Sequence, residues 1–277
     1  MKKFGNAVAF LFIALITVSC EVDEPSCPDS EQLVAGFELL PEKRVANDQG
    51  AGLTARYIYP VDRYTHGILG DAIEAGALLV TQCDQMMIYK LDTLHVFEDL
   101  QPRLVDVTND GTPEIITILT SVTEGASVAV FQIDSDSLML KAQSDYIGRR
   151  NRWLNIAAVN DLDVDGVVEI AWVSTPHIGG LLKVSQIEGD QLVVKDTISG
   201  VSNHRIHTRN LCLSVISIAN NQKVLYVPND AFDALIGLQW KNDQILPVDT
   251  IFLEVDPNLP LPDQYNFGTI AVEYDCD

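Results

Sequence analysis

The sequence predicts an all-β fold made of repeated units, and three observations lead to this expectation. Apolar runs are short and are separated by turn residues, with no sustained helical period. Hairpin patterns recur along the chain, each with two strand-like runs flanking Asp, Asn or Gly residues that suit tight turns. Two related acidic loops are each followed by a β-rich run. The chain of 277 residues is long enough for one large β domain with a substantial core.

Four hairpins give the period of the repeat, and they lie at residues 87–97, 128–140, 182–194 and 236–246. The residues that end the first strand of each hairpin are 42, 54 and 53 residues apart, and they are Leu91, Ile133, Ile187 and Trp240. A period near fifty residues with four strands in each unit is typical of a β-propeller. We therefore expect a propeller of four-stranded blades, with clear blades near residues 62–98, 100–146, 149–200 and 205–253.

A fifth blade is expected from the two ends of the chain. Residues 269–277 match residues 155–163 in pattern, and they resemble the first strand of a repeat that has no continuation. Strand-like segments also occur within residues 33–60. A ring closes if the C-terminal strand completes a blade that begins at the N-terminal end. The sequence therefore favours five blades closed by the C-terminal strand.

Two acidic loops carry the candidate metal ligands. In the second acidic loop, residues 161–169, the candidate ligands are Asp161, Asp163, Asp165, the Val167 carbonyl and Glu169. In the first acidic loop, residues 106–114, they are Asp106, Thr108, Asp110 and Glu114. Alternating oxygen ligands followed by glycine let a tight loop surround a hard cation, and Ca²⁺ takes roughly 6–8 oxygens. We expect structural Ca²⁺ in both loops, bound more weakly where Thr108 replaces an acid; turns that hold no metal are the alternative.

The acid at position nine distinguishes these loops from an EF-hand, which has Glu at position twelve and a helix afterwards. Position twelve is Thr117 or Trp172 here, and strand-like residues follow. The pattern resembles the FG-GAP/VCBS-type repeat of the β-propellers in integrin α-chains and many bacterial surface proteins. The resemblance covers most of the chain and implies calcium loops that tie the first two strands of a blade. Integrin-like members have seven blades, and this chain is too short for seven of that length.

Residues 1–19 are interpreted as a lipoprotein signal peptide. Lys2 and Lys3 precede an apolar run at residues 7–18 that is too short to span a bilayer. Small residues then lead to Cys20, the expected lipidation site, although Thr17 stands where this pattern usually has Leu. An ordinary secretory signal cleaved nearby is the alternative. We expect an exported protein, lipid-anchored to the bacterial outer membrane.

The remaining domain boundaries and the expected disulfides depend on the interpretation of the chain as an exported protein. Residues 20–32 are acidic and contain Ser and Pro, which indicates a flexible tether, and residues 33–277 form the expected propeller domain. Four cysteines in an exported chain allow two disulfides with three connectivities. A Cys27–Cys276 bond would close the two ends of the domain. Cys212 lies in an apolar run and is alternatively a buried thiol.

The charge balance limits the possible partners. The formal net charge is −21, which argues against nucleic acid because phosphate binding needs clustered positive charge. The scarce arginines nevertheless gather in the connectors between expected blades, which share one face of a propeller. The residues expected to bind an anionic ligand there are Arg149, Arg150, Arg152, Trp153, Arg205 and His207. Salt bridges to carboxylates of neighbouring blades are the alternative role of the arginines.

No catalytic signature is present, whether a Gly-x-Ser-x-Gly, a His-Glu-x-x-His or a phosphate-binding glycine loop. His204 and His207 are interpreted as exposed loop residues rather than a transition-metal pair. The sequence thus favours a non-catalytic cell-envelope module that binds an anionic glycan or a peptide of a protein ligand at the cell surface. One alternative is a glycan-active enzyme on a propeller scaffold, which rests on analogy of fold alone. Another is a structural component of a surface complex.

Overall fold

The computed structural model describes residues 33–219 and 222–253, and these residues form seventeen β-strands. The expectation of an all-β fold is therefore confirmed. Among the described residues, no helix has the length and apolar character needed to cross a membrane.

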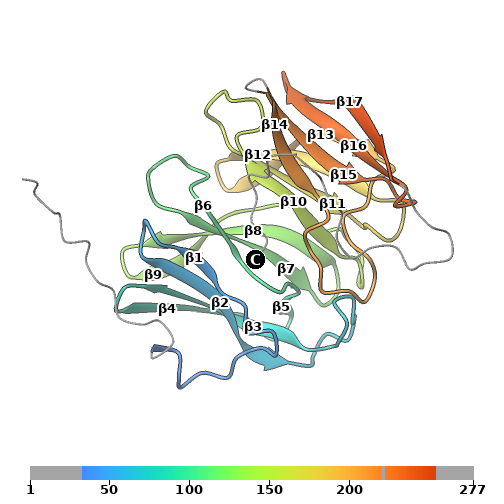
Figure 1. Cartoon of the computed structure of the whole chain (residues 1–277). Helices are drawn as coiled ribbons and strands as arrows, with labels where there is room; N and C mark the ends of the chain where they lie inside the picture. Colours follow the sequence, from blue (N-terminus) through green and yellow to red (C-terminus); the bar gives the residue numbers. More distant parts are fainter. Residues whose placement is uncertain (1–32, 220–221, 254–277) are drawn as a thin grey trace, which may run out of the picture.

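Sixteen of the strands form four antiparallel meanders of four strands each, which we name units 1 to 4 (Figure 1). Unit 1 contains β1 (Ala46–Asp48), β2 (Leu53–Val61), β3 (Glu74–Gln82) and β4 (Gln85–Lys90). Unit 2 contains β6 (Arg103–Val105), β7 (Glu114–Ser121), β8 (Gly125–Asp134) and β9 (Ser137–Gln143). Unit 3 contains β10 (Leu154–Asn160), β11 (Glu169–Ser174), β12 (Leu181–Glu188) and β13 (Gln191–Ser199). Unit 4 contains β14 (Val215–Ala219), β15 (Gln222–Pro228), β16 (Ala234–Lys241) and β17 (Gln244–Phe252).

The seventeenth strand, β5 (His95–Phe97), lies between units 1 and 2 and pairs with both β3 and β7. A single parallel bridge, between Gln191 and Gln143, connects β13 to β9. These links merge units 1 to 3 into one sheet of thirteen strands, whereas unit 4 is a separate sheet of four strands.

Three of the four expected hairpins are confirmed as β8–β9, β12–β13 and β16–β17. The expected hairpin at 87–97 is wrong, because β4 pairs with β3 across the turn at Cys83 and does not pair with β5. The first unit consequently spans residues 46–90 rather than 62–98, and residues 62–73 form a link between β2 and β3. Residues 53–61, which were expected to help to build a fifth blade, belong to unit 1.

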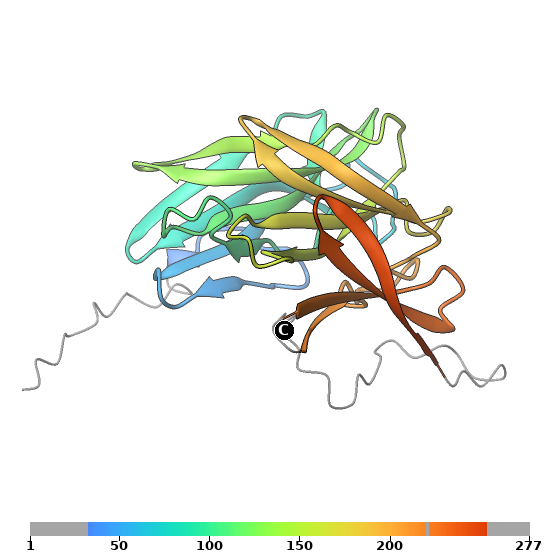
Figure 2. The same cartoon turned by 90° about the horizontal axis from the view of Figure 1, so that it is seen from above.

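Apolar side chains cover both faces of most strands, so neighbouring units pack face to face. Phe97 and Phe131 belong to the cluster between units 1 and 2, and Ile116 and Trp172 to the cluster between units 2 and 3. A third cluster joins units 3 and 4. The outer faces of units 1 and 4 carry their own smaller clusters. Units 1 and 4 accordingly lie on opposite sides of the molecule, with units 2 and 3 between them (Figures 1 and 2).

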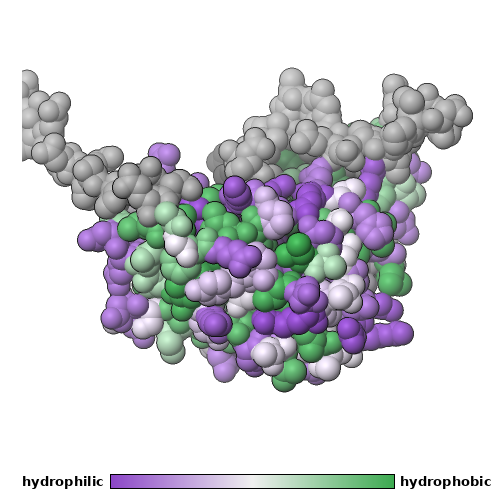
Figure 3. Space-filling view, turned by 90° about the horizontal axis from the view of Figure 1, so that it is seen from below, coloured by the Kyte–Doolittle hydropathy of each residue, from purple (hydrophilic) through white to green (hydrophobic). Residues whose placement is uncertain are grey.

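The antiparallel order sorts the loops between two ends of the strands. Links from one unit to the next, and from the second to the third strand of a unit, emerge at one end, which we name the connector end. The remaining turns, including both acidic loops, emerge at the acidic-loop end. The arginine-rich connectors and the candidate calcium loops are thus held at opposite ends. Figure 3 shows the molecule from below relative to Figure 1, and hydrophilic and hydrophobic residues are interspersed on the face seen there.

Candidate functional site

A pocket of about 350 Å³ opens at the connector end, and we name it the connector pocket. Its walls come from the links 62–73, 144–153, 175–180 and 200–214, which are far apart in sequence. The lining residues are His66, Ile68, Asn151, Arg152, Trp153, Thr175, His177, Ile178 and Ile206. The volume falls at the small end of the range of ligand pockets, roughly 300–1,000 Å³. A pocket of this size suits a small ligand or one terminal group of a larger one.

The turn at residues 148–152, which we name the arginine turn, is fixed by backbone hydrogen bonds. The N–H groups of Gly148 and Arg149 both donate to the Glu124 carbonyl at 2.8 Å. The Asn151 N–H donates to the hydroxyl of the buried Tyr64 at 3.0 Å. This support places Arg152 at the wall of the connector pocket, while Arg149 and Arg150 are exposed beside it.

Most of the other connector arginines already have a structural role. Arg63 donates to the His95 carbonyl, and the Arg205 guanidinium stacks on the Phe232 ring at 4.7 Å. The ion pairs are Arg103 with Asp99, and Arg209 with both Glu42 and Asp71. The alternative of salt bridges to neighbouring units therefore fits Arg209, whereas Arg103 pairs with an acid of its own connector. Within residues 33–219 and 222–253, the ion pairs do not include the three arginines of the arginine turn.

Trp153, one of the expected ligand-binding residues, is almost completely buried. Only 2% of its surface is exposed, because it packs in the cluster between units 2 and 3. Its indole N–H donates to the Glu98 carbonyl at 2.8 Å, and its ring lies parallel to that of His177 at 6.2 Å. Trp153 thus forms part of the floor of the connector pocket and orients a histidine. Of the expected ligand-binding residues, Arg152 and Trp153 line this pocket, whereas Arg149, Arg150, Arg205 and His207 do not.

Two histidines form a hydrogen-bonded chain behind the pocket. His204 is fully buried, so the expectation of an exposed loop residue is wrong for it, whereas His207 is exposed. His204 Nε2 lies 3.0 Å from the Thr208 carbonyl, and His204 Nδ1 lies 2.9 Å from His177 Nε2. Burial lowers the pKa of His177 to about 4 and that of His204 to about 3. Both imidazoles are therefore neutral near pH 7.

Buried acids lie beside the connector pocket. Glu98 is fully buried, and its Oε1 lies 2.7 Å from His66 Nδ1. Its Oε2 accepts a hydrogen bond from the Thr120 hydroxyl at 3.0 Å. Burial raises the pKa of Glu98, and the hydrogen bond from His66 opposes that shift. Burial, followed by the nearby charge of Glu98, raises the pKa of Glu74 to about 10. Glu74 is therefore protonated at neutral pH.

The two acidic loops at the other end share one hydrogen-bond pattern. In the second loop, Asp161 accepts from the N–H groups of Asp165 and Gly166, both at 3.0 Å. In the first loop, Asp106 accepts from the equivalent N–H groups at 3.1 and 2.8 Å. The carboxylate of the ninth loop residue, Glu169 or Glu114, accepts a hydrogen bond from the backbone N–H of the second loop residue, Leu162 or Val107. The expected equivalence of the loops is thus visible in their backbone conformation.

The loops differ at their third position. In the second loop, carboxylate oxygens of Asp161, Asp163 and Glu169 come within 4.8 Å of one another, and Oδ1 of Asp163 is buried without a hydrogen-bond partner. In the first loop, the Thr108 hydroxyl donates to Glu114 at 2.9 Å, so the threonine satisfies the acid that would face a cation. Burial and the neighbouring Asp165 and Asp161 raise the pKa of Asp163. The donor set of the second loop fits a hard divalent cation, and that of the first fits it less well.

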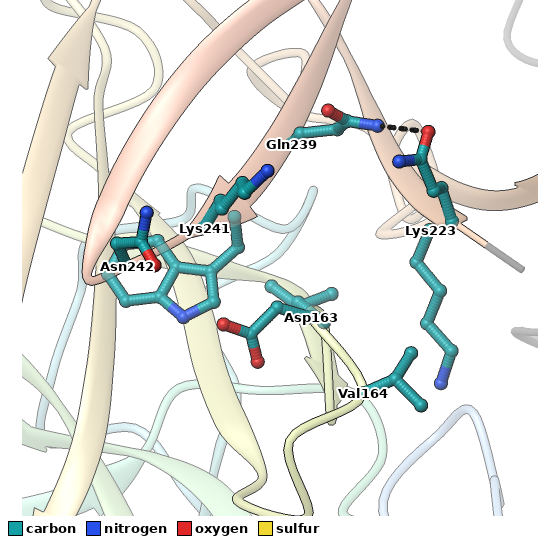
Figure 4. Close-up of a pocket in the computed structure, with 9 residues that line it drawn as sticks. Asp163, Val164, Lys223, Gln239, Lys241 and Asn242 are labelled. Carbon is teal, nitrogen blue, oxygen red and sulfur yellow. Dashed lines mark hydrogen bonds between the residues drawn. The ribbon is translucent and has the colours of Figure 1, made fainter.

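A second pocket, of about 380 Å³, lies beside the second acidic loop, between unit 3 and unit 4. The side chain of Asp163 points into this space, with Lys241 and Asn242 on one side and Val164 and Lys223 on the other (Figure 4). Lys223 also binds the side chain of Asn160 at the end of β10. Asp163 is accessible from solvent through this pocket, which would give a cation a route of entry.

Cys83 and Cys212 are both disulfide-bonded, which corrects the alternative of a buried thiol at Cys212. Cys20, Cys27 and Cys276 lie outside the described residues, so lipidation and the Cys27–Cys276 bond stay predictions. The expected C-terminal strand at 269–277 lies outside them as well.

The comparisons with known proteins are sparse. No protein-family model and no curated protein matches the chain. A crystal structure of the rhamnogalacturonan lyase YesW matches with a TM-score of 0.41 and 10% sequence identity, over 80% of this chain and 54% of that one. The chain thus spans about half the length of that enzyme. Similarity this distant transfers neither a fold nor an activity.

Proposed function

We propose that the protein is a non-catalytic binding module whose connector pocket takes an anionic ligand through Arg152. One observation carries the proposal: within the described residues, Arg152 lines a pocket and has no carboxylate partner, in a chain with a net charge of −21. Arg152 uses one donor on the Asn151 carbonyl at 2.8 Å, and its remaining donors can form strong, directional hydrogen bonds to a carboxylate, sulfate or phosphate. Arg149 and Arg150 would attract such a ligand from within roughly 8–10 Å, the screening length at physiological salt.

Replacing Arg152 with glutamine should weaken the binding of a small carboxylate, for which cyclohexanecarboxylate is the probe. A hydrogen bond to a charged group contributes about 1.5–3 kcal/mol, which corresponds to a roughly 10- to 100-fold loss of affinity by isothermal titration calorimetry. Arg150→Gln is the matched control, because it removes the same charge two residues away without touching the pocket. If both variants lose affinity equally, the arginine turn acts as a diffuse charged surface and the pocket is not the site.

We further propose that the second acidic loop binds Ca²⁺ and that the first binds it weakly or not at all. The unpartnered Oδ1 of Asp163 supports the first statement, and the bond between Thr108 and Glu114 supports the second. Asp161, Asp163 and Glu169 would hold the ion, which would offset their mutual repulsion and tie β10 to β11. The role is structural, because the loop lies at the end of the strands opposite the connector pocket.

Exchanging the third residues of the two loops tests this assignment. Asp163→Thr copies the first loop and should abolish the rise in melting temperature on adding Ca²⁺, a rise worth about 2.7 kcal/mol when Ca²⁺ is at 100 times its Kd. Thr108→Asp copies the second loop and should create a second site, which titration calorimetry would report as two ions per chain. A calcium response that survives Asp163→Thr would place the ion elsewhere.

The four units are proposed to be blades of a propeller. Their meander topology and face-to-face packing support this interpretation, as do the bonds of Arg209 to Glu42 and Asp71, which link the connector before unit 4 to unit 1. A fifth blade closed by the C-terminal strand would need residues 254–277, since residues 46–61 already belong to unit 1. Export, lipidation at Cys20 and attachment to the outer membrane remain part of the proposal on sequence grounds alone.

A further inference from the structure

The side chains of the connector pocket differ in what they offer a ligand, and two of them can only accept hydrogen bonds. The Thr208 carbonyl is an acceptor, so the neutral His204 carries its proton on Nε2 and accepts at Nδ1. His177 must then donate from Nε2 to His204, which leaves His177 Nδ1 as an acceptor. No other partner for His177 Nδ1 occurs among the described residues. The histidine chain therefore fixes the tautomer of a residue that lines the pocket.

Thr175 is the second acceptor in the pocket. Its hydroxyl donates to the Ile178 carbonyl at 3.2 Å, so its oxygen is left to accept from a molecule in the pocket. Thr175 and His177 belong to the same short link between β11 and β12, and both line the pocket. One wall of the pocket thus carries two side chains with a free acceptor, while Arg152 and Asn151 carry donors on the arginine turn.

A simple carboxylate cannot satisfy both walls, because it carries no donor. Thr175 and His177 are half-buried, so a ligand that covers their acceptors without donating to them would incur a cost of about 1–3 kcal/mol for each. A ligand that combines an anionic group with hydroxyl groups would satisfy Arg152 and both acceptors. Ile68, Ile178 and Ile206 would cover its apolar face, and the volume of about 350 Å³ limits its size.

We propose that the connector pocket recognises a hydroxylated carboxylate of the size of one sugar acid, with Thr175 and His177 as the residues that read its hydroxyl groups. This inference rests on the proposed function, because it assigns the anionic group to Arg152. It selects the carbohydrate class over a peptide carboxylate, which offers no cluster of hydroxyl groups.

The test compares two probes of equal ring size on the full chain, by titration calorimetry. D-Glucuronate carries a carboxylate and hydroxyl groups, whereas cyclohexanecarboxylate carries the carboxylate alone. The wild type should bind glucuronate at least 10-fold more tightly. Thr175→Val keeps the shape and removes one acceptor, and His177→Phe keeps the ring against Trp153 and removes the other. Each variant should lose roughly 5- to 10-fold in glucuronate affinity while its affinity for cyclohexanecarboxylate is unchanged.

The outcomes separate this inference from the proposed function. If neither probe binds the wild type, the proposed anion pocket fails and the present inference fails with it. If both probes bind equally and the variants change neither affinity, the anion pocket stands and the reading of hydroxyl groups is overturned. His207→Phe is the control, since it alters an exposed histidine of the adjacent connector and should change neither affinity. Unchanged cyclohexanecarboxylate binding also shows that each variant is folded, and mass spectrometry of recovered glucuronate would reveal any turnover.

Discussion

Replacing Glu74 with glutamine should stabilise the protein, and the gain should grow as the pH rises. Glu74 is 2% exposed at the start of β3, and its pKa is raised to about 10 by burial and by the nearby Glu98. In the unfolded chain the same carboxyl ionises near its usual pKa of 4.5. Between these values the folded state retains a proton that the unfolded state has lost. The contribution of Glu74 is therefore complete below pH 4.5 and declines as the pH rises toward 10.

Glutamine resembles the protonated carboxyl in shape and does not titrate, so the variant escapes this decline. Each unit of pKa difference corresponds to about 1.4 kcal/mol, and the gain at pH 8 relative to pH 5 should be on the order of 3 kcal/mol. That gain would raise the melting temperature by roughly 6–12 °C for a chain of this size. Thermal melts of both proteins from pH 5 to pH 8 measure it. Glu124→Gln, at an exposed position, should show no such trend, and a constant gap between wild type and Glu74→Gln would contradict the buried neutral carboxyl.

Placing alanine at Gly125 should disrupt the arginine turn. Gly125 has φ of +80°, and an added Cβ would lie 2.4 Å from the Arg149 carbonyl oxygen and 2.7 Å from that of Arg152. Both obstacles are backbone atoms, so the turn itself would have to move. The left-handed conformation alone costs an L-residue about 1–2 kcal/mol, and the displacement should bring the loss of stability to about 2–4 kcal/mol. Affinity for cyclohexanecarboxylate should fall at least 10-fold, because Arg152 would leave the pocket wall.

Gly148→Ala provides the matched control for this displacement. Gly148 lies in the same turn with φ of +87°, but an added Cβ would meet nothing within 4 Å. This variant should lose only the conformational part of the stability and should retain binding. Urea denaturation gives the stability of each variant, and titration calorimetry gives its affinity. Equal effects of the two substitutions on binding would mean that the turn adapts without moving Arg152.

The parts of the fold that depend on local chemistry could be predicted from the sequence. The hairpin turns at 134–136, 188–190 and 241–243 contain Asp, Asn or Gly, and all three form as expected. The prediction of the first hairpin was wrong because the turn that forms, at Cys83 and Asp84, contains only one such residue, whereas Asp92 offered an equal signal further along the chain. The segment at 95–97 resembled the partner strand of β4, but it pairs with β3 and β7. Those strands are about 20 residues away in sequence, so no local pattern predicts the pairing.

In the candidate site, too, features encoded by neighbouring residues could be predicted, whereas those that depend on long-range contacts could not. The two acidic loops were found because their ligands lie within nine residues of one another. The connector pocket was found only in part, since Arg152 and Trp153 belong to an arginine-rich connector, whereas His177 belongs to a link inside unit 3. His177 matters because His204, 27 residues away, fixes its tautomer, and no local pattern encodes that contact. A rule that placed both kinds of link at one end of the strands would have added His177 to the candidates.

The strand β5 has a consequence for how the protein opens. Its pairs with β3 and β7 make the boundary between units 1 and 2 a hydrogen-bonded one, so these units should exchange their amide protons as one cooperative block. No strand of unit 4 pairs with a strand of unit 3 within the described ranges. Unit 4 is held to unit 3 by side-chain packing, by an isolated bridge between Val201 and Asn229 and by single hydrogen bonds such as that from the Ile245 N–H to Asp196. With fewer backbone bonds to break at this boundary, unit 4 should be the first part of the protein to open. Most of the connector pocket, built on units 1 to 3, would survive such an excursion.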